Sequence, residues 1–139
     1  MSDDEFLIAF ERCTLYRSQW THEAHIRMAW LYLARYSVSE SIERARIGIR
    51  SLNSFFQSIA CGLGQETRDG YHDTITVAFV RLIASRFNKN ESYLEFRERN
   101  LDLLDRTLTA LLHFYSKDRL HSVAAKEQFI EPDLLKLPV

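Results

Sequence analysis

The chain contains only 4 glycines and 2 prolines in 139 residues, and this scarcity constrains its fold more than any other feature. Folds built from many short strands need frequent tight turns, which glycine and proline form most readily. Apolar residues instead recur at the three- and four-residue spacing of amphipathic helices. We therefore predict an all-α single domain over residues 1–139, a helical bundle of four main helices with a short N-terminal helix and an extended C-terminal tail.

Cap residues and helix breaks divide the chain into five expected helices. These cover residues 3–12, 21–36, 38–58, 69–87 and 92–115. Thr21 and Asp69 are the expected N-caps of the second and fourth helices. Ser37 and Ser92 each begin a Ser-x-x-Glu capping box. A short helical turn at 122–129 then leads into the tail, where each proline disfavours helix at the residue before it.

Charge and apolar content restrict the classes of partner. The formal net charge is −1, which offers no positive surface for nucleic acid or for an anionic membrane. No apolar run approaches the roughly 20 residues that cross a bilayer, and the N-terminus is acidic where a secretory signal is basic. The 2 cysteines are too few for a disulfide scaffold. We therefore expect a cytoplasmic protein with a small-molecule partner, no nucleic acid and no membrane.

Three histidines are expected to face the protein interior. At about 100° per residue, His22 lies at the centre of the apolar stripe of the second expected helix. His25 lies about 60° to one side of that centre, and His72 occupies the centre of the stripe of the fourth expected helix. All three belong to the first turn of a helix, so two helices whose first turns meet would bring three imidazoles together.

Two polar residues on the third expected helix strengthen this pattern. Asn53 falls in the middle of the apolar stripe, and Arg46 falls at its edge. A buried polar group without a partner costs about 1–3 kcal/mol, so both side chains need one. Together with the three histidines, they predict a polar pocket in a helical core.

The leading functional hypothesis is a metal-dependent enzyme. His22, His25 and His72 would bind a divalent metal ion, with zinc or iron favoured by the nitrogen ligands. Three protein ligands leave one position open for water or substrate, which is the catalytic arrangement. Glu11 is the nearest candidate for an additional carboxylate ligand.

The substrate of such an enzyme is expected to be a small polar or anionic metabolite. Arg46 would pair with its carboxylate or phosphate, Asn53 would orient it, and Tyr71 would form a wall of the pocket. Two alternatives remain open. The same pocket without metal would be a non-catalytic module that binds a small molecule or anion at helix N-termini. The histidines would otherwise form a purely structural hydrogen-bond network.

Four segments together carry a resemblance to a known family. They are Trp20-Thr-His-Glu-Ala-His25, Arg46-Ile-Gly-Ile-Arg-Ser-Leu-Asn53, Gly70-Tyr-His-Asp-Thr74 and Phe129-Ile-Glu-Pro-Asp-Leu134. This set resembles a family of small bacterial all-α proteins of no established function, with the motifs W-T-H-x-x-H, R-x-x-x-x-x-x-N, G-Y-H-[DE]-T and a P-D-L tail. The resemblance covers nearly the whole chain. It implies that His22, His25, His72, Arg46 and Asn53 form one site, and it implies no substrate.

The second expected helix also suggests self-association. Met28 and Leu31 lie on its side away from the histidines, so this helix is apolar nearly all round. Such a helix is either buried on every side or covers a partner. We therefore predict a possible homodimer with Met28 and Leu31 in or near its interface. The alternative is that the tail from Pro132 to Val139 covers this face within one chain.

Overall fold

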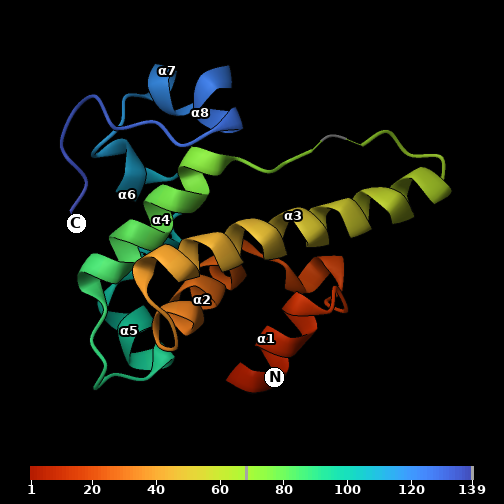
Figure 1. Cartoon of the computed structure of the whole chain (residues 1–139), viewed down its shortest axis with the longest axis horizontal. Helices are drawn as coiled ribbons and strands as arrows, with labels where there is room; N and C mark the ends of the chain where they lie inside the picture. The colour runs from red at the N-terminus through yellow and green to blue at the C-terminus, as the bar shows by residue number, and fades with distance from the viewer. Residues whose placement is uncertain (68, 139) are drawn as a thin grey trace.

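The all-α prediction is confirmed by a computed structural model, which describes residues 1–67 and 69–138 (Figure 1). These residues form eight α-helices and two 3-10 helices and contain no strand. The elements are α1 (Asp3–Glu11), η1 (Arg17–Gln19), α2 (His22–Leu33), α3 (Val38–Gly62), α4 (Asp73–Arg86), α5 (Tyr93–Arg99), η2 (Leu101–Leu104), α6 (Thr109–Leu112), α7 (Lys117–Leu120) and α8 (Val123–Glu127). Within the described ranges, no helix is both long and apolar enough to span a membrane.

The predicted hydroxyl N-caps are confirmed. The side chains of Thr21, Ser37 and Ser92 each accept a hydrogen bond from the backbone N–H three residues further on. At Ser92 the capping box is complete, because the Glu95 side chain also accepts from the backbone N–H of Ser92. These bonds satisfy N–H groups that have no partner within the helix and so fix where α2, α3 and α5 begin.

The prediction that Asp69 caps the fourth helix is wrong. Its carboxylate accepts instead from the N–H of Tyr71 at 3.0 Å, which forms a turn before the helix. Helix α4 begins only at Asp73, with His72 as its N-cap. Ring nitrogen Nδ1 of His72 accepts from the N–H of Ile75 at 3.1 Å. An imidazole therefore takes the capping role that the sequence pattern assigned to a carboxylate.

The single long helix predicted over residues 92–115 is also wrong, because two backbone features interrupt it. Asn100 leaves the helical region, with φ −133°, and its side-chain amide donates to the carbonyl oxygen of Phe96 at 2.8 Å. Leu108 then adopts the left-handed conformation, with φ 63°. Apolar spacing continues across both interruptions, since Leu103 and Leu111 are buried like Phe96. Periodicity alone therefore could not reveal that the region is divided into α5, η2 and α6.

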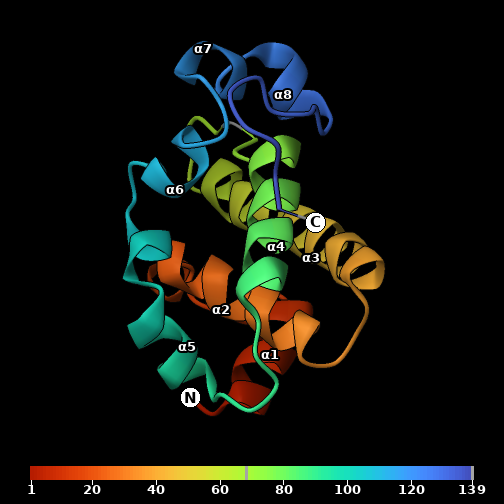
Figure 2. The ribbon, with the colours of Figure 1, turned by 90° about the vertical axis from the view of Figure 1, so that its left-hand side faces the viewer.

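Helix α2 is the central element of the fold (Figure 2). It packs against α1, α3, α4, α5 and η2. Met28 and Leu31 are each only 2% exposed within the single chain. Neighbouring helices surround α2, so the burial of these two side chains needs no second copy. The alternative that the tail covers this face stays a prediction. The homodimer itself stays a prediction that no longer has this argument behind it.

The first helix is held close to α3 at Gly48. An added Cβ at this glycine would lie 2.3 Å from the ring of Phe10, which is fully buried. Only a residue without a side chain allows this approach. The contact places the segment after α1 beside the C-terminal half of α3, which extends past the other helices in Figure 1.

Candidate functional site

A cavity of about 290 Å³ lies beside the central helix, and we call it the histidine cavity. Two of the predicted site residues, His22 and His25, line it. The other walls are almost entirely apolar and come from α2, α3, α4 and the residue before α6. They are Ile26, Met28, Ala29, Ile49, Ile75, Thr76, Phe79, Val80 and Leu108.

The ring of His22 has a defined tautomer in its neutral form. Its Nε2 lies 2.8 Å from the carbonyl oxygen of Leu103 in η2. A carbonyl oxygen only accepts hydrogen bonds, so Nε2 carries the proton and Nδ1 is left as an acceptor. The ring also packs edge-on against Phe79 at 5.6 Å between centroids. This long-range bond connects the first turn of α2 to a segment about eighty residues later in the chain.

His25 has the opposite tautomer. Its Nδ1 lies 2.7 Å from the carbonyl oxygen of Thr21, so Nδ1 carries the proton and Nε2 is the acceptor. The ring stacks on Trp20, with 3.8 Å between centroids. Burial lowers the pKa of His25 to about 4, the Thr21 carbonyl acts against this shift, and the nearby His22 adds to it. His25 is therefore neutral near pH 7.

His72 lies apart from this pair, because it does not line the histidine cavity. Its Nδ1 caps α4, and its Nε2 lies 2.8 Å from the carbonyl oxygen of Leu120 at the end of α7. Burial is the main cause that lowers its pKa. Both ring nitrogens are therefore engaged in hydrogen bonds that hold α4 and α7 in place.

Arg46 and Tyr71 both bind the carboxylate of Asp73. Asp73 is only 4% exposed. Arg46 donates from Nε and Nη2 to the two carboxylate oxygens, at 2.9 and 3.1 Å. The Tyr71 hydroxyl donates at 2.5 Å, and the Phe129 N–H donates at 2.8 Å. Burial alone would raise the pKa of Asp73, but the hydrogen bonds from Arg46 and Tyr71 outweigh it and lower that pKa. We call these four residues the Asp73 cluster.

The guanidinium group of Arg46, which the sequence assigned to a substrate, binds Asp73 instead. The remaining Arg46 nitrogen, Nη1, donates to Glu43 at 2.5 Å. Its whole guanidinium group therefore pairs with carboxylates of its own chain. Because Phe129 lies in the segment after α8, the cluster joins α3, the start of α4 and the C-terminal region. This is a structural role for a strong, bidentate ion pair.

The other two candidates also lie away from the histidine cavity. Asn53 is half-buried on α3, and its side chain has no hydrogen-bond partner in the part of the chain that the structure describes. Glu11 is exposed at the end of α1, beside a surface depression that Tyr32 and Arg44 also line. Neither residue lines the cavity that contains His22 and His25.

The structure thus brings His22 and His25 together in the histidine cavity. Arg46 and Tyr71 meet at Asp73, outside that cavity. His72 lies at neither place and bonds to backbone groups of Ile75 and Leu120. Over residues 1–67 and 69–138, no group of three or more histidine, cysteine, aspartate or glutamate side chains is arranged to hold a metal ion. A three-histidine centre is therefore not assembled by the described residues.

Sequence reasoning missed two residues that shape these sites. One is Asp73, the carboxylate partner of Arg46. A half-buried arginine needs a carboxylate, and this need was the only signal in the sequence for such a partner. Leu108 forms a wall of the histidine cavity in a left-handed conformation that is rare for leucine. The Asp105 carboxylate holds this turn by accepting from Thr107 and Thr109.

Comparison with known proteins places the chain in no family, because no family model, no curated protein and no solved structure matches it. The family resemblance of the four sequence segments therefore stays a prediction.

Proposed function

We propose that the protein binds a small, uncharged organic molecule in the histidine cavity. The observation that carries this proposal is the pair of imidazoles that line it. Each ring donates one N–H to a backbone carbonyl and keeps its other nitrogen as an acceptor. An apolar pocket with a few oriented polar groups is typical of small-molecule sites. This proposal corresponds to a metal-free binding module rather than to an enzyme.

The lining of the cavity favours a particular class of ligand. The two acceptor nitrogens, Nδ1 of His22 and Nε2 of His25, favour a ligand that has a hydroxyl or N–H donor. The apolar walls call for a ring or short hydrocarbon body, and about 290 Å³ is small for a ligand pocket. A carboxylate or phosphate would lose its hydration without meeting a cation, since Arg46 is paired with Asp73. The ligand we propose is therefore neutral rather than anionic.

A divalent metal ion, zinc or iron, is a second candidate for the same place. The supporting observation is that His22 and His25 each donate a ring N–H to a carbonyl, which is how histidine ligands are commonly oriented. The metal would have two protein ligands, with water or substrate in its other positions. The engaged nitrogens of His72 weigh against the third ligand that a catalytic zinc site usually has.

Phenol, toluene and benzoate test the proposal, because they share a ring but differ in donor and charge. We expect chelator-treated protein to bind phenol about five- to tenfold more tightly than toluene, in line with about 1–1.5 kcal/mol for one hydrogen bond. We expect no binding of benzoate. In the double variant His22→Phe/His25→Phe the preference for phenol over toluene should be lost, whereas His113→Phe, at an exposed position, should retain it. Protein-observed NMR titration gives the three affinities.

Other results would contradict the proposal. Equal affinity for phenol and toluene, or an unchanged preference in the double variant, would show that the imidazoles do not recognise a donor. Stoichiometric zinc or iron in protein purified without chelator would favour the metal, if His22→Ala and His25→Ala both lose it. Loss of that metal in His72→Ala as well would restore the three-histidine site.

A further inference from the structure

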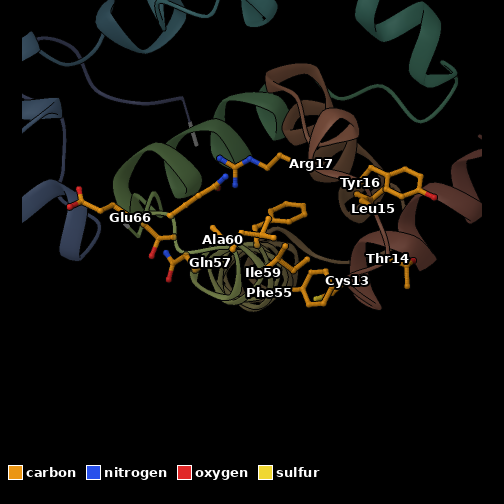
Figure 3. Close-up of a pocket in the computed structure, with 14 residues that line it drawn as sticks. Cys13, Thr14, Leu15, Tyr16, Arg17, Phe55, Gln57, Ile59, Ala60 and Glu66 are labelled. Atoms are coloured by element: carbon orange, nitrogen blue, oxygen red, sulfur yellow. The ribbon is translucent and has the colours of Figure 1, made fainter.

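A second and larger cleft, of about 710 Å³, lies between α3 and the segment that follows α1. One wall is the C-terminal half of α3, and the other is the segment from Cys13 to Arg17 (Figure 3). Residues that follow α3, among them Glu66, close one end. We call this the α3 cleft. None of its lining residues also lines the histidine cavity.

The wall formed by α3 is apolar and exposed. Phe55, Ile59 and Leu63 follow one another at four-residue spacing and are 43%, 48% and 70% exposed. Phe56 on the same helix and Leu15 on the opposite wall are buried and also line the cleft. Contiguous apolar surface of this kind on a soluble helix usually marks a binding site. The concave shape and the volume match those of small-molecule pockets.

A single cation overhangs this apolar wall. The guanidinium carbon of Arg17 lies 5.2 Å from the centre of the Phe56 ring, and Figure 3 shows its side chain reaching over the cleft. Arg17 has no carboxylate partner in the part of the chain that the structure describes. Arg27, by contrast, is paired with Asp3 at 2.8 Å. The charge of Arg17 is therefore available at the edge of an apolar groove.

We propose that the α3 cleft binds an amphipathic anion. The apolar body of the ligand lies along Phe55, Ile59 and Leu63, and its single anionic group pairs with the Arg17 guanidinium. A guanidinium group binds carboxylate, sulfonate or phosphate oxygens through two parallel hydrogen bonds. Burying the exposed apolar side chains supplies the remaining affinity. This ligand class differs from the neutral one proposed for the histidine cavity, so either site can exist without the other.

Three probes with the same ten-carbon chain separate the contribution of the ligand's charge to affinity from that of its apolar chain. They are decanoate, decanol and decyltrimethylammonium. Each is measured by isothermal titration calorimetry, the two ions below their critical micelle concentrations and decanol below its solubility limit. We expect decanoate to bind about tenfold more tightly than decanol, the equivalent of one charge-assisted hydrogen bond, and the cationic probe to bind least. Arg17→Gln should remove the preference for decanoate. Arg12→Gln, an exposed arginine beside the cleft that does not line it, should retain it.

A second matched pair of variants locates the apolar contact. Ile59→Ser should weaken decanoate and decanol alike, whereas Ile47→Ser changes an exposed isoleucine of the same helix outside the cleft and should leave both unchanged. His25→Phe should also leave both unchanged, which separates this test from that of the histidine cavity. Equal binding of all three probes, or equal effects of the two isoleucine variants, would overturn the proposal. So would a dimer in sedimentation that Ile59→Ser dissociates, because a second copy would then occupy the cleft.

Discussion

Replacing Asp73 with alanine is expected to lower the free energy of unfolding by about 3–5 kcal/mol. The carboxylate is buried and accepts four hydrogen bonds, from Arg46, Tyr71 and the N–H of Phe129. Its removal deprives the buried Tyr71 hydroxyl and the half-buried Phe129 N–H of this acceptor, at about 1–3 kcal/mol each. It also removes one of the hydrogen bonds between the start of α4 and the C-terminal region, whereas those of Thr74 with Gln128 and Ile130 remain. Equilibrium unfolding in urea measures the loss.

Glu43→Ala is the matched control for Asp73→Ala. Glu43 pairs with the same arginine, but its side chain is 59% exposed, and exposed ion pairs contribute about 0–1 kcal/mol. We therefore expect a change below about 1 kcal/mol in this variant. Equally small changes in the two variants would contradict the structural role of the Asp73 cluster. Arg46 would then be available for the substrate contact that the sequence suggested.

The free energy of unfolding is expected to fall by about 2 kcal/mol between pH 7.5 and pH 5 because of His25 alone. Burial lowers the pKa of this ring from 6.5 to about 4 in the folded protein. Between these two values the unfolded chain binds a proton that the folded chain does not. The contribution of His25 to the free energy of unfolding is therefore fully present above pH 6.5. It is lost as the pH falls towards the pKa of about 4 that His25 has in the folded protein. His72, whose pKa is also lowered, acts in the same direction.

His25→Gln should remove the His25 share of this pH dependence, because glutamine does not titrate. His113→Gln is the control, since His113 is exposed and should leave the dependence intact. Urea unfolding at pH 7.5, 6 and 5 keeps the measurement above the range in which Asp73 is protonated, because its pKa is lowered from 3.8. The same slope in the wild type and in His25→Gln would show that His25 is not buried as a neutral ring.

The sequence predicted the helices best where a local signal decides. A hydroxyl N-cap needs only the next three residues, and Thr21, Ser37 and Ser92 follow this rule. The division of residues 92–115 depends instead on Asn100 and Leu108, whose backbone conformations are set by tertiary packing. Apolar residues recur across these positions at a spacing that also fits one long helix, since Leu103 and Leu111 are buried, although Leu101 is 54% exposed.

The candidate site was predictable in part for the same reason. Helical spacing identified His22 and His25 as inward-facing, and both line one cavity. The partner of each ring could not be predicted. His22 bonds to Leu103, which is distant in the sequence, and His72 turned out to precede its helix rather than lie within it. A helical wheel gives no direction for a residue outside the helix, so it could not orient the ring of His72.

Nitrogen-15 NMR of the imidazole rings tests the central claim most directly, because it reports which ring nitrogen carries the proton. At pH 7 we predict that the Nε2 of His22 carries a proton, and that His25 is neutral with its proton on Nδ1. Saturating phenol should shift the resonance of at least one of the two acceptor nitrogens, Nδ1 of His22 or Nε2 of His25, and leave His72 unchanged. A protonated His25, reversed tautomers, or acceptor resonances that phenol does not move would contradict the account.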